Sequence, residues 1–228
     1  MVWDLDGTLV DSYEAITSSL NRAREAFSLP RLPEEVVRRH VGRGLEALLA
    51  DLLGGSRVEE GVRIFREHYP KVFPTQTFLL PGVQETLGEL HERGYRMAVA
   101  SNKPARFGKA ILESLGVMRY LDDVQGPDSS GRTKPHPAMI RQCLVAMDLP
   151  VRDAIYVGDM SLDVESAARA GLPVLLVTGG SAGAEDLRGT GETVLDSILD
   201  LLTLLPARPG VLERDGASGR EPTPEGTS

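Results

Sequence analysis

The spacing of apolar residues changes along the chain and divides it into two parts. From residue 12 to residue 70 they recur every three or four positions, the period of amphipathic helices. No strand-like run appears between Val10 and Pro74. From Pro81 onward, helical periods alternate with short apolar runs typical of buried strands. The first part therefore predicts an all-helical segment, and the second predicts alternating strands and helices.

Alternation of strands with helices through short links favours a parallel sheet covered by helices on both faces. Gly94, Gly116 and Gly171 follow three of the expected helices, where glycine commonly ends a helix. The expected strands are 95–100, 121–124, 154–157 and 172–177, and the expected helices are 83–94, 111–116, 136–147, 161–170 and a final helix over 194–205.

Both ends of the chain also have a distinctive composition. Only Met1-Val2-Trp3 precede Asp4, so the first strand, expected at the centre of the sheet, is unusually short unless the true start lies upstream. We expect residues 1–12 and 80–205 to form the α/β core, with residues 13–79 inserted between them. Residues 206–228 are rich in proline, glycine and charge, which predicts a disordered tail.

Composition excludes several classes of protein. The chain has 228 residues, of which 41% are hydrophobic, and a net charge of −8 without a basic tract. A dedicated nucleic-acid binder or a peripheral membrane protein is therefore not expected. The single cysteine, Cys143, lies in an amphipathic run and predicts a buried thiol rather than a disulfide or a cysteine zinc site. No transmembrane stretch or signal peptide is recognisable, so we expect a cytoplasmic protein.

Two pairs of aspartates follow predicted buried strands. Asp4 and Asp6 come directly after the first strand, and side chains two apart in a strand lie on the same side. Asp159 follows the strand 154–157, with Asp163 one helical turn later. Carboxylates at the carboxyl edge of a parallel sheet predict a Mg²⁺ site or acid–base chemistry. The alternative is that these acids only cap turns and helix N-termini.

Two further loops carry candidate anion-binding groups. Ser101 and Asn102 follow the strand 95–100, where a hydroxyl and free N–H groups can bind an anion. Lys134 is followed by Pro135 and Pro137, and a lysine on such a stiff segment can neutralise a phosphoryl oxygen. Alternatively, Ser101 or Asn102 is a simple helix cap and Lys134 a solvated loop lysine.

Four segments, in this order along the chain, resemble the motifs of the haloacid dehalogenase-like hydrolases. They are Asp4-Leu5-Asp6-Gly7-Thr8, Ser101-Asn102, Lys134-Pro135-His136-Pro137 and Gly158 to Asp163. The resemblance covers residues 1–205 and implies a Rossmann-like catalytic core with residues 13–79 as a helical cap. It also implies phosphoryl transfer, because dehalogenases of this superfamily lack the second aspartate that Asp6 supplies.

The resemblance implies a role for each candidate residue. Asp4 would attack phosphorus to form an aspartyl-phosphate, and Asp6 would serve as general acid and then as general base. The cofactor Mg²⁺ would bind Asp4, the backbone carbonyl of Asp6 and Asp159. Asp163 would support it directly, through water, or by orienting Lys134. The groups that would bind the phosphoryl oxygens or assist Asp6 are Lys134, Ser101, the backbone of Asn102, and Thr8.

The cap carries a candidate specificity residue. The run from His40 to Leu49 resembles the substrate-specificity segment of phosphoglycolate phosphatases. We hypothesise that Arg43 binds a substrate carboxylate, since guanidinium pairs bidentately with carboxylates. The alternative is a solvent-facing arginine on a helix interrupted by Gly42 and Gly44.

The expected function is a Mg²⁺-dependent phosphatase acting on a small phosphomonoester, with phosphoglycolate as the expected substrate. A sugar-phosphate mutase or a pyrophosphatase on the same scaffold is the alternative enzyme, and a non-catalytic regulator that binds phosphate or Mg²⁺ is the alternative from another class. The expected partner is the small-molecule substrate, without nucleic acid or membrane, and both a monomer and a homodimer are compatible with the sequence.

Overall fold

Val2 and Trp3 form the short strand β1 (Val2–Trp3) at the centre of a six-stranded parallel sheet. The computed structural model describes residues 1–207. The strand order is β5-β4-β1-β6-β7-β8. Val2 lies opposite Ala98 of β4 on one side and Tyr156 of β6 on the other. The other strands are β4 (Ala98–Ala100), β5 (Asp123–Gln125), β6 (Tyr156–Gly158), β7 (Val174–Val177) and β8 (Thr193–Leu195).

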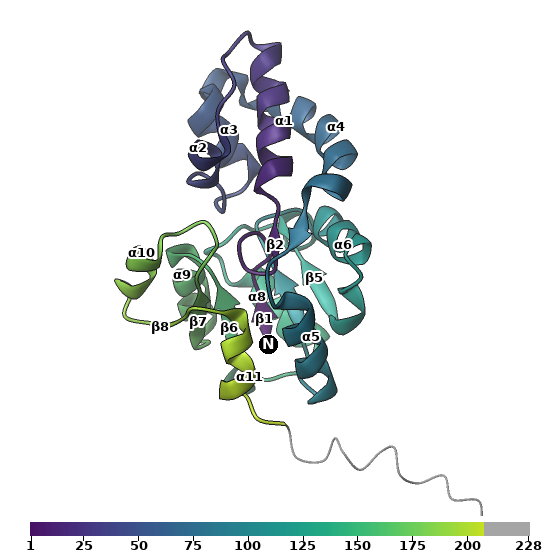
Figure 1. The fold of residues 1–228 in the computed structure, drawn as a ribbon, viewed down its shortest axis with the longest axis vertical. Helices are drawn as coiled ribbons and strands as arrows, with labels where there is room; N and C mark the ends of the chain where they lie inside the picture. The colour runs from purple at the N-terminus through teal and green to yellow at the C-terminus, as the bar shows by residue number, and fades with distance from the viewer. Residues whose placement is uncertain (208–228) are drawn as a thin grey trace, which may run out of the picture.

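Alternation along each strand divides the core between the two faces of the sheet. Trp3 and Val157 pack on one face, with apolar residues of α5 (Val83–Glu92), α6 (Ala105–Ser114) and α11 (Leu201–Leu204). Val2 and Tyr156 pack on the other, with those of α8 (Ala138–Ala146), α9 (Ser161–Ala170) and α10 (Ala184–Arg188). The predicted fold class, a parallel α/β sheet covered on both faces, is confirmed (Figure 1).

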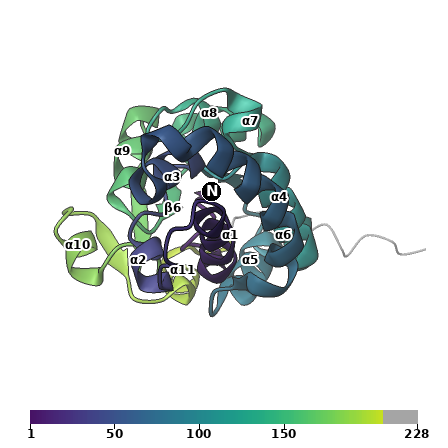
Figure 2. The ribbon, with the colours of Figure 1, turned by 90° about the horizontal axis from the view of Figure 1, so that it is seen from above.

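Residues 13–76 form a separate layer, which we call the helical segment. It contains α1 (Tyr13–Ala26), α2 (Glu34–Arg38), α3 (Leu45–Leu53) and α4 (Val58–Gln76). The four helices stand above the α/β core, with α1 packed along α4 (Figures 1 and 2). The segment joins the core through the antiparallel strands β2 (Val10–Asp11) and β3 (Phe78–Leu79), in which Val10 lies opposite Leu79.

Several short elements connect the main ones. The 3₁₀ turns are η1 (Gly55–Arg57), η2 (Met118–Tyr120), η3 (Val151–Asp153) and η4 (Ile198–Asp200), and α7 (Pro127–Ser130) is a single helical turn. Within residues 1–207 no helix is both long and apolar enough to cross a membrane.

The helix expected over 111–116 begins earlier, at Ala105, and α7 and α10 were not expected. Two further differences concern the end of the described chain and the inserted segment. The final helix over 194–205 is wrong: Val194 belongs to β8, and the helical turns begin only at Ile198, where Ser197 caps the N–H of Leu199. The segment 13–79 is also not helical throughout, because β3 lies within it. Most of the predicted tail, 206–228, lies outside the described residues.

Candidate active site

The turn after β1 places Asp4 and Asp6 in different surroundings. The Asp4 side chain is buried, and its Oδ1 lies 2.8 Å from Nζ of Lys134. Asp6 faces away from that lysine: its Oδ1 accepts a 2.5 Å hydrogen bond from Ser12 Oγ, and its Oδ2 lies 3.2 Å from Nζ of Lys103. Two carboxylates two residues apart are therefore each held by a different ammonium group.

Gly7 allows this turn to approach the neighbouring strand end. Its φ of +87° lies in the left-handed region, which residues with a side chain rarely adopt. A Cβ at this position would lie 2.4 Å from Oδ2 of Asp159 and 2.5 Å from the hydroxyl of Tyr13. Glycine is therefore required here both by backbone conformation and by space.

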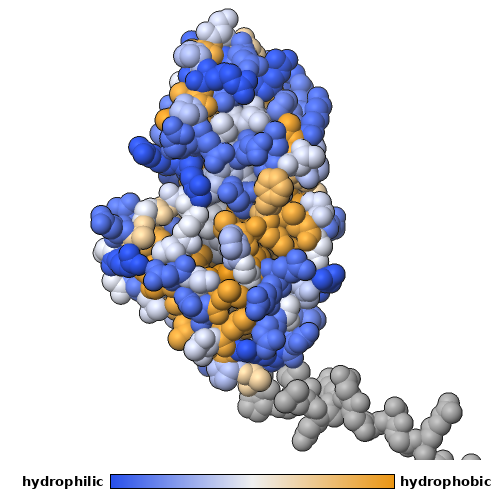
Figure 3. All heavy atoms as spheres, viewed as in Figure 1, coloured by the Kyte–Doolittle hydropathy of each residue, from blue (hydrophilic) through white to orange (hydrophobic). Residues whose placement is uncertain are grey.

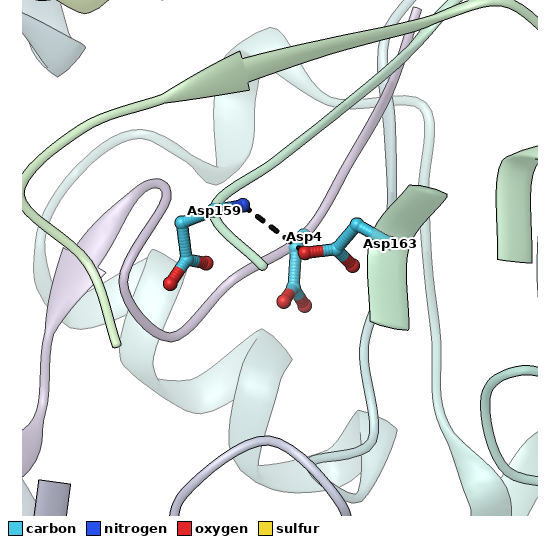
Figure 4. A group of neighbouring side chains, drawn as sticks. All are labelled: Asp4, Asp159 and Asp163. Atoms are coloured by element: carbon cyan, nitrogen blue, oxygen red, sulfur yellow. Dashed lines mark hydrogen bonds between the residues drawn. The ribbon is translucent and has the colours of Figure 1, made fainter. Parts of the chain in front are cut away.

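Asp159 and Asp163 reach the same edge of the sheet from β6 and α9. Asp159 accepts hydrogen bonds from Thr8 Oγ1 at 2.9 Å and from the N–H of Ser181 at 2.6 Å. Asp163 Oδ2 accepts the N–H groups of Asp159 and Met160 at the start of α9, at 3.0 and 3.1 Å. One oxygen each of Asp4, Asp159 and Asp163 lie within 4.8 Å of one another, and all three residues are buried (Figure 4).

Lys134 lies between two of these carboxylates. Its Nζ lies 2.8 Å from both Asp4 Oδ1 and Asp163 Oδ1, and 3.2 Å from the hydroxyl of Tyr156. The Tyr156 hydroxyl in turn donates to the carbonyl of Ala100 at 2.9 Å. Burial alone would lower the pKa of Lys134, but the charges of Asp163 and Asp4 raise it, so this lysine stays an ammonium.

The three buried carboxylates outnumber the ammonium group beside them. Burial, and then the charges of Asp163 and Asp4, raise the pKa of Asp159 well above its usual value. Within residues 1–207, Asp4 Oδ1 has no polar partner besides the Lys134 ammonium. An uncompensated cluster of hard oxygen donors fits a divalent cation such as Mg²⁺, which would neutralise the excess charge.

The loop after β4 connects this cluster to the helical segment. Ser101 is buried, and its Oγ accepts the N–H of Lys103 at 3.3 Å. Asn102 bridges two elements, since its Nδ2 donates to the carbonyl of Gly42 at 2.8 Å and its Oδ1 accepts the N–H of Lys134 at 2.7 Å. The Asn102 side chain, rather than its backbone alone, therefore orders the loop that carries Lys134.

Two residues lie elsewhere than the sequence interpretation expected. Thr8 donates to Asp159 and not to Asp6. Arg43 forms an ion pair with Asp51, its side chain is 60% exposed, and it does not line the cavity described below. The physical reason is that Gly42 and Gly44, at φ of +118° and +94°, turn the backbone so that the Gly42 carbonyl faces Asn102.

The structure adds residues that the sequence did not single out. Lys103 contacts Asp6, Tyr156 supports Lys134, and Ser181 holds Asp159. Lys103 could have been noticed, because it directly follows the predicted anion-binding pair Ser101-Asn102. Tyr156 and Ser181 carry no local signal, since their roles depend on packing between β6, β4 and the loop after β7.

A cavity opens between the helical segment and the carboxyl edge of the sheet. Asp4, Asp6 and Ser101 lie on the core side, and the apolar side chains of Val41, Leu45 and Phe65 lie on the side of the helical segment. Candidate catalytic side chains and a mainly apolar wall therefore face each other across one cavity.

The protein has a Rossmann-like sheet with acidic side chains and a lysine gathered at its carboxyl edge. This arrangement is typical of α/β enzymes. The family described as haloacid dehalogenase-like hydrolase matches residues 1–177. The chain belongs to this family.

Individual relatives extend the match over most of the chain. A phosphoglycolate phosphatase from Cupriavidus necator is 33% identical over 210 residues, which cover 90% of each chain. One from Vibrio parahaemolyticus is 31% identical over 90% of this chain and 95% of its own. The structure of a predicted phosphoglycolate phosphatase from Haemophilus somnus superposes with a TM-score of 0.82 at 27% identity, covering 89% of this chain and 96% of that one. The protein is accordingly an enzyme of the phosphatase type.

Proposed function

We propose that the protein is a Mg²⁺-dependent phosphatase that hydrolyses a small phosphomonoester, with phosphoglycolate as the substrate, through an aspartyl-phosphate. The observation that carries the proposal is the buried cluster of Asp4, Asp159, Asp163 and Lys134, of which Asp4 lines the cavity between the core and the helical segment. The substrate is supported by the relatives that are described as phosphoglycolate phosphatases.

Asp4 and Asp6 carry the two chemical steps. An Asp4 carboxylate oxygen bonds to phosphorus while the bond from phosphorus to the ester oxygen breaks, and Asp6 donates a proton to that departing oxygen. Asp6 then takes a proton from a water molecule, which attacks phosphorus and releases inorganic phosphate from Asp4. The separate surroundings of the two acids support separate roles, because Asp4 faces Lys134 and Asp6 faces Ser12 and Lys103.

The remaining residues position the reacting groups and neutralise the charge of the phosphoryl group. Mg²⁺ would be held by Asp4, Asp159 and the backbone carbonyl of Asp6, and it supplies positive charge against the transferring phosphoryl group. Asp163 supports the site by orienting Lys134, because its Oδ1 accepts a hydrogen bond from Nζ while its Oδ2 is held by two N–H groups at the start of α9. Lys134 neutralises a phosphoryl oxygen, Ser101 donates a hydrogen bond to another, and Thr8 holds Asp159.

The helical segment serves as a cap, with residues 13–79 as the inserted part of the chain and residues 1–12 and 80–205 as the core. Its apolar side chains form one wall of the cavity, and closing that wall over the substrate excludes water from the first step.

Phosphate release from a panel of phosphomonoesters, with and without Mg²⁺, tests the proposal. We expect activity that requires Mg²⁺, is highest on phosphoglycolate, and is lost in Asp4→Asn but kept in Asp186→Asn, a matched change at an exposed helix position. Activity that survives Asp4→Asn refutes the covalent route. Transfer of the phosphoryl group without phosphate release indicates a mutase, and no turnover of any ester indicates a binding role.

A further inference from the structure

Lys103 is a buried lysine that the proposed chemistry leaves without a task. It belongs to the loop between β4 and α6, and its side chain crosses to the helical segment. Its Nζ lies 3.2 Å from Asp6 Oδ2, donates to the hydroxyl of Tyr69 on α4 at 2.9 Å, and lies 4.7 Å from the centre of the Tyr69 ring. Its side chain is only 7% exposed.

Two of its three N–H donors have partners. An ammonium group can donate three hydrogen bonds; here it donates one to the hydroxyl of Tyr69 and forms an ion pair with Asp6. Residues 1–207 provide no acceptor for the third. Lys103 also lines the cavity between the core and the helical segment, so that a ligand in the cavity can reach it.

Lys103 is the one cationic side chain among the described residues that line this cavity. The rest of the wall is largely apolar and includes Ile16, Leu48, Phe107 and Phe65. In such surroundings a charged hydrogen bond is stronger than in water, and an anion without a partner is unfavourable. The cavity therefore offers one position for a negative charge beyond the phosphoryl group.

We propose that Lys103 binds the carboxylate of the substrate's leaving group and thereby selects carboxylated phosphomonoesters. The proposal rests on the proposed function and transfers to Lys103 the role that the sequence interpretation assigned to Arg43. In phosphoglycolate a single methylene separates the ester oxygen from the carboxylate. An ester oxygen that Asp6 protonates therefore brings its carboxylate beside the lysine that contacts Asp6.

Asp6 and Tyr69 fix the position of the Lys103 ammonium group. They hold the ammonium from the core and from α4, respectively, so that its position does not depend on the ligand. Lys103 is thus a specificity-determining residue. The competing interpretation is that it only positions Asp6, in which case every substrate depends on it equally.

Two esters of nearly equal size separate these interpretations. Phosphoglycolate and 2-hydroxyethyl phosphate differ in that the second replaces the carboxylate with a neutral hydroxymethyl group. We would measure kcat and KM for both, at saturating Mg²⁺, in the wild-type protein, Lys103→Met, Lys103→Arg and Lys109→Met. Lys109 is a half-exposed lysine on α6 that does not line the cavity, so it provides the matched control.

We expect Lys103→Met to lower the ratio of kcat/KM for phosphoglycolate over 2-hydroxyethyl phosphate by about 10- to 100-fold, the loss typical of one charged hydrogen bond. The change should come mainly from a higher KM for phosphoglycolate. Lys103→Arg, which keeps the charge, should retain most of the ratio, and Lys109→Met should leave it unchanged.

If Lys103→Met lowers kcat/KM equally for both esters, the proposal is overturned. Lys103 then only positions Asp6. Circular dichroism and the thermal midpoint of each variant show whether it is folded, and Lys103→Gln, which also removes the charge, decides the question if the methionine variant is not folded. Failure of the proposed substrate has a different signature, because it appears in the wild-type protein as the absence of any preference for phosphoglycolate. That result refutes both the proposed substrate and the role of Lys103. A wild-type preference for phosphoglycolate, combined with equal losses of kcat/KM in Lys103→Met, refutes only the role of Lys103.

Discussion

Replacing Asp159 with asparagine should stabilise the metal-free protein and abolish its stabilisation by Mg²⁺. Asn has the same shape as Asp and can keep both hydrogen bonds of this side chain. Its Oδ1 can accept the N–H of Ser181, and its Nδ2 can donate to Thr8 Oγ1, whose hydroxyl changes from donor to acceptor. The substitution therefore removes a charge and little else.

The size of the effect follows from the spacing of the carboxylates. Oxygens of Asp4, Asp159 and Asp163 lie within 4.8 Å of one another, and at an effective dielectric constant of about 20 one pair of such charges repels by about 3 kcal/mol. Lys134 offsets part of this, and protonation of Asp159, whose pKa is raised, limits the rest. A gain of about 1–3 kcal/mol remains, or roughly 2–10 °C in Tm for a chain of this length.

Thermal unfolding in EDTA and in Mg²⁺ tests this expectation. The wild-type protein should gain about 2.7 kcal/mol at a Mg²⁺ concentration 100 times Kd, whereas Asp159→Asn should gain far less, so the order of stability reverses between the two conditions. Asp186→Asn, exposed on α10, should behave like the wild type in both. A variant that melts below the wild type in EDTA, or that gains the same shift from Mg²⁺, refutes the reasoning.

Three other changes address single contacts. Tyr156→Phe removes a buried hydroxyl that donates to Ala100 and contacts Lys134, and we expect a loss of about 1–3 kcal/mol in the free energy of unfolding by denaturant titration. Burial and the charges of Lys71 and Arg22 lower the pKa of His68, so the folded state loses stability as the pH falls below about 6.5, the pKa of the unfolded chain. In His68→Gln the fall in Tm between pH 7.5 and 5.5 should be smaller; an equal fall contradicts this. Arg43→Ala should leave KM for phosphoglycolate nearly unchanged, because the Arg43 guanidinium pairs with Asp51. A rise in KM that is specific to carboxylated esters would instead support the predicted binding of the substrate carboxylate by Arg43.

The sequence was most informative where a buried strand leads directly into a polar residue. Asp4, Ser101 and Asp159 each follow a strand of strongly apolar character, and neighbouring parallel strands end at the same edge of the sheet. The period therefore predicted the main strands and helices from Pro81 to Val177 and the strand ends at which these side chains lie, and the family resemblance added Lys134.

Sequence reasoning was weaker where the outcome depends on packing between distant segments. The helical period over 194–205 is also compatible with a strand followed by a turn, and pairing of β8 with β7 decides between them. Helix α4 continues through Pro70 and Pro74 to Gln76, beyond residue 70, where the helical spacing of apolar residues ends in the sequence. The sequence gives no sign of the contacts that Lys103 makes, because Asp6 and Tyr69 belong to two other segments of the chain.

The surface adds an apolar zone that no motif predicted. Phe78 on β3 is 56% exposed. Figure 3 shows a hydrophobic area near the middle of the face that it draws. The position of Phe78 results from the path of the chain back from α4 into the core. The helical period of the preceding residues gives no indication that the next two will pair as a strand.

The pairing of β2 with β3 has a consequence for how such enzymes can diversify. The chain leaves the core at Asp11 and returns at Phe78, and these two residues lie opposite each other in one ladder. The chain therefore leaves and re-enters the core at neighbouring positions, and side chains such as Asn102 and Lys103 make the further contacts between the core and the helical segment. A different set of helices, longer or shorter, could be exchanged between these positions without moving any strand of the main sheet. New leaving-group preferences could then evolve while the carboxylates and Lys134 keep their positions.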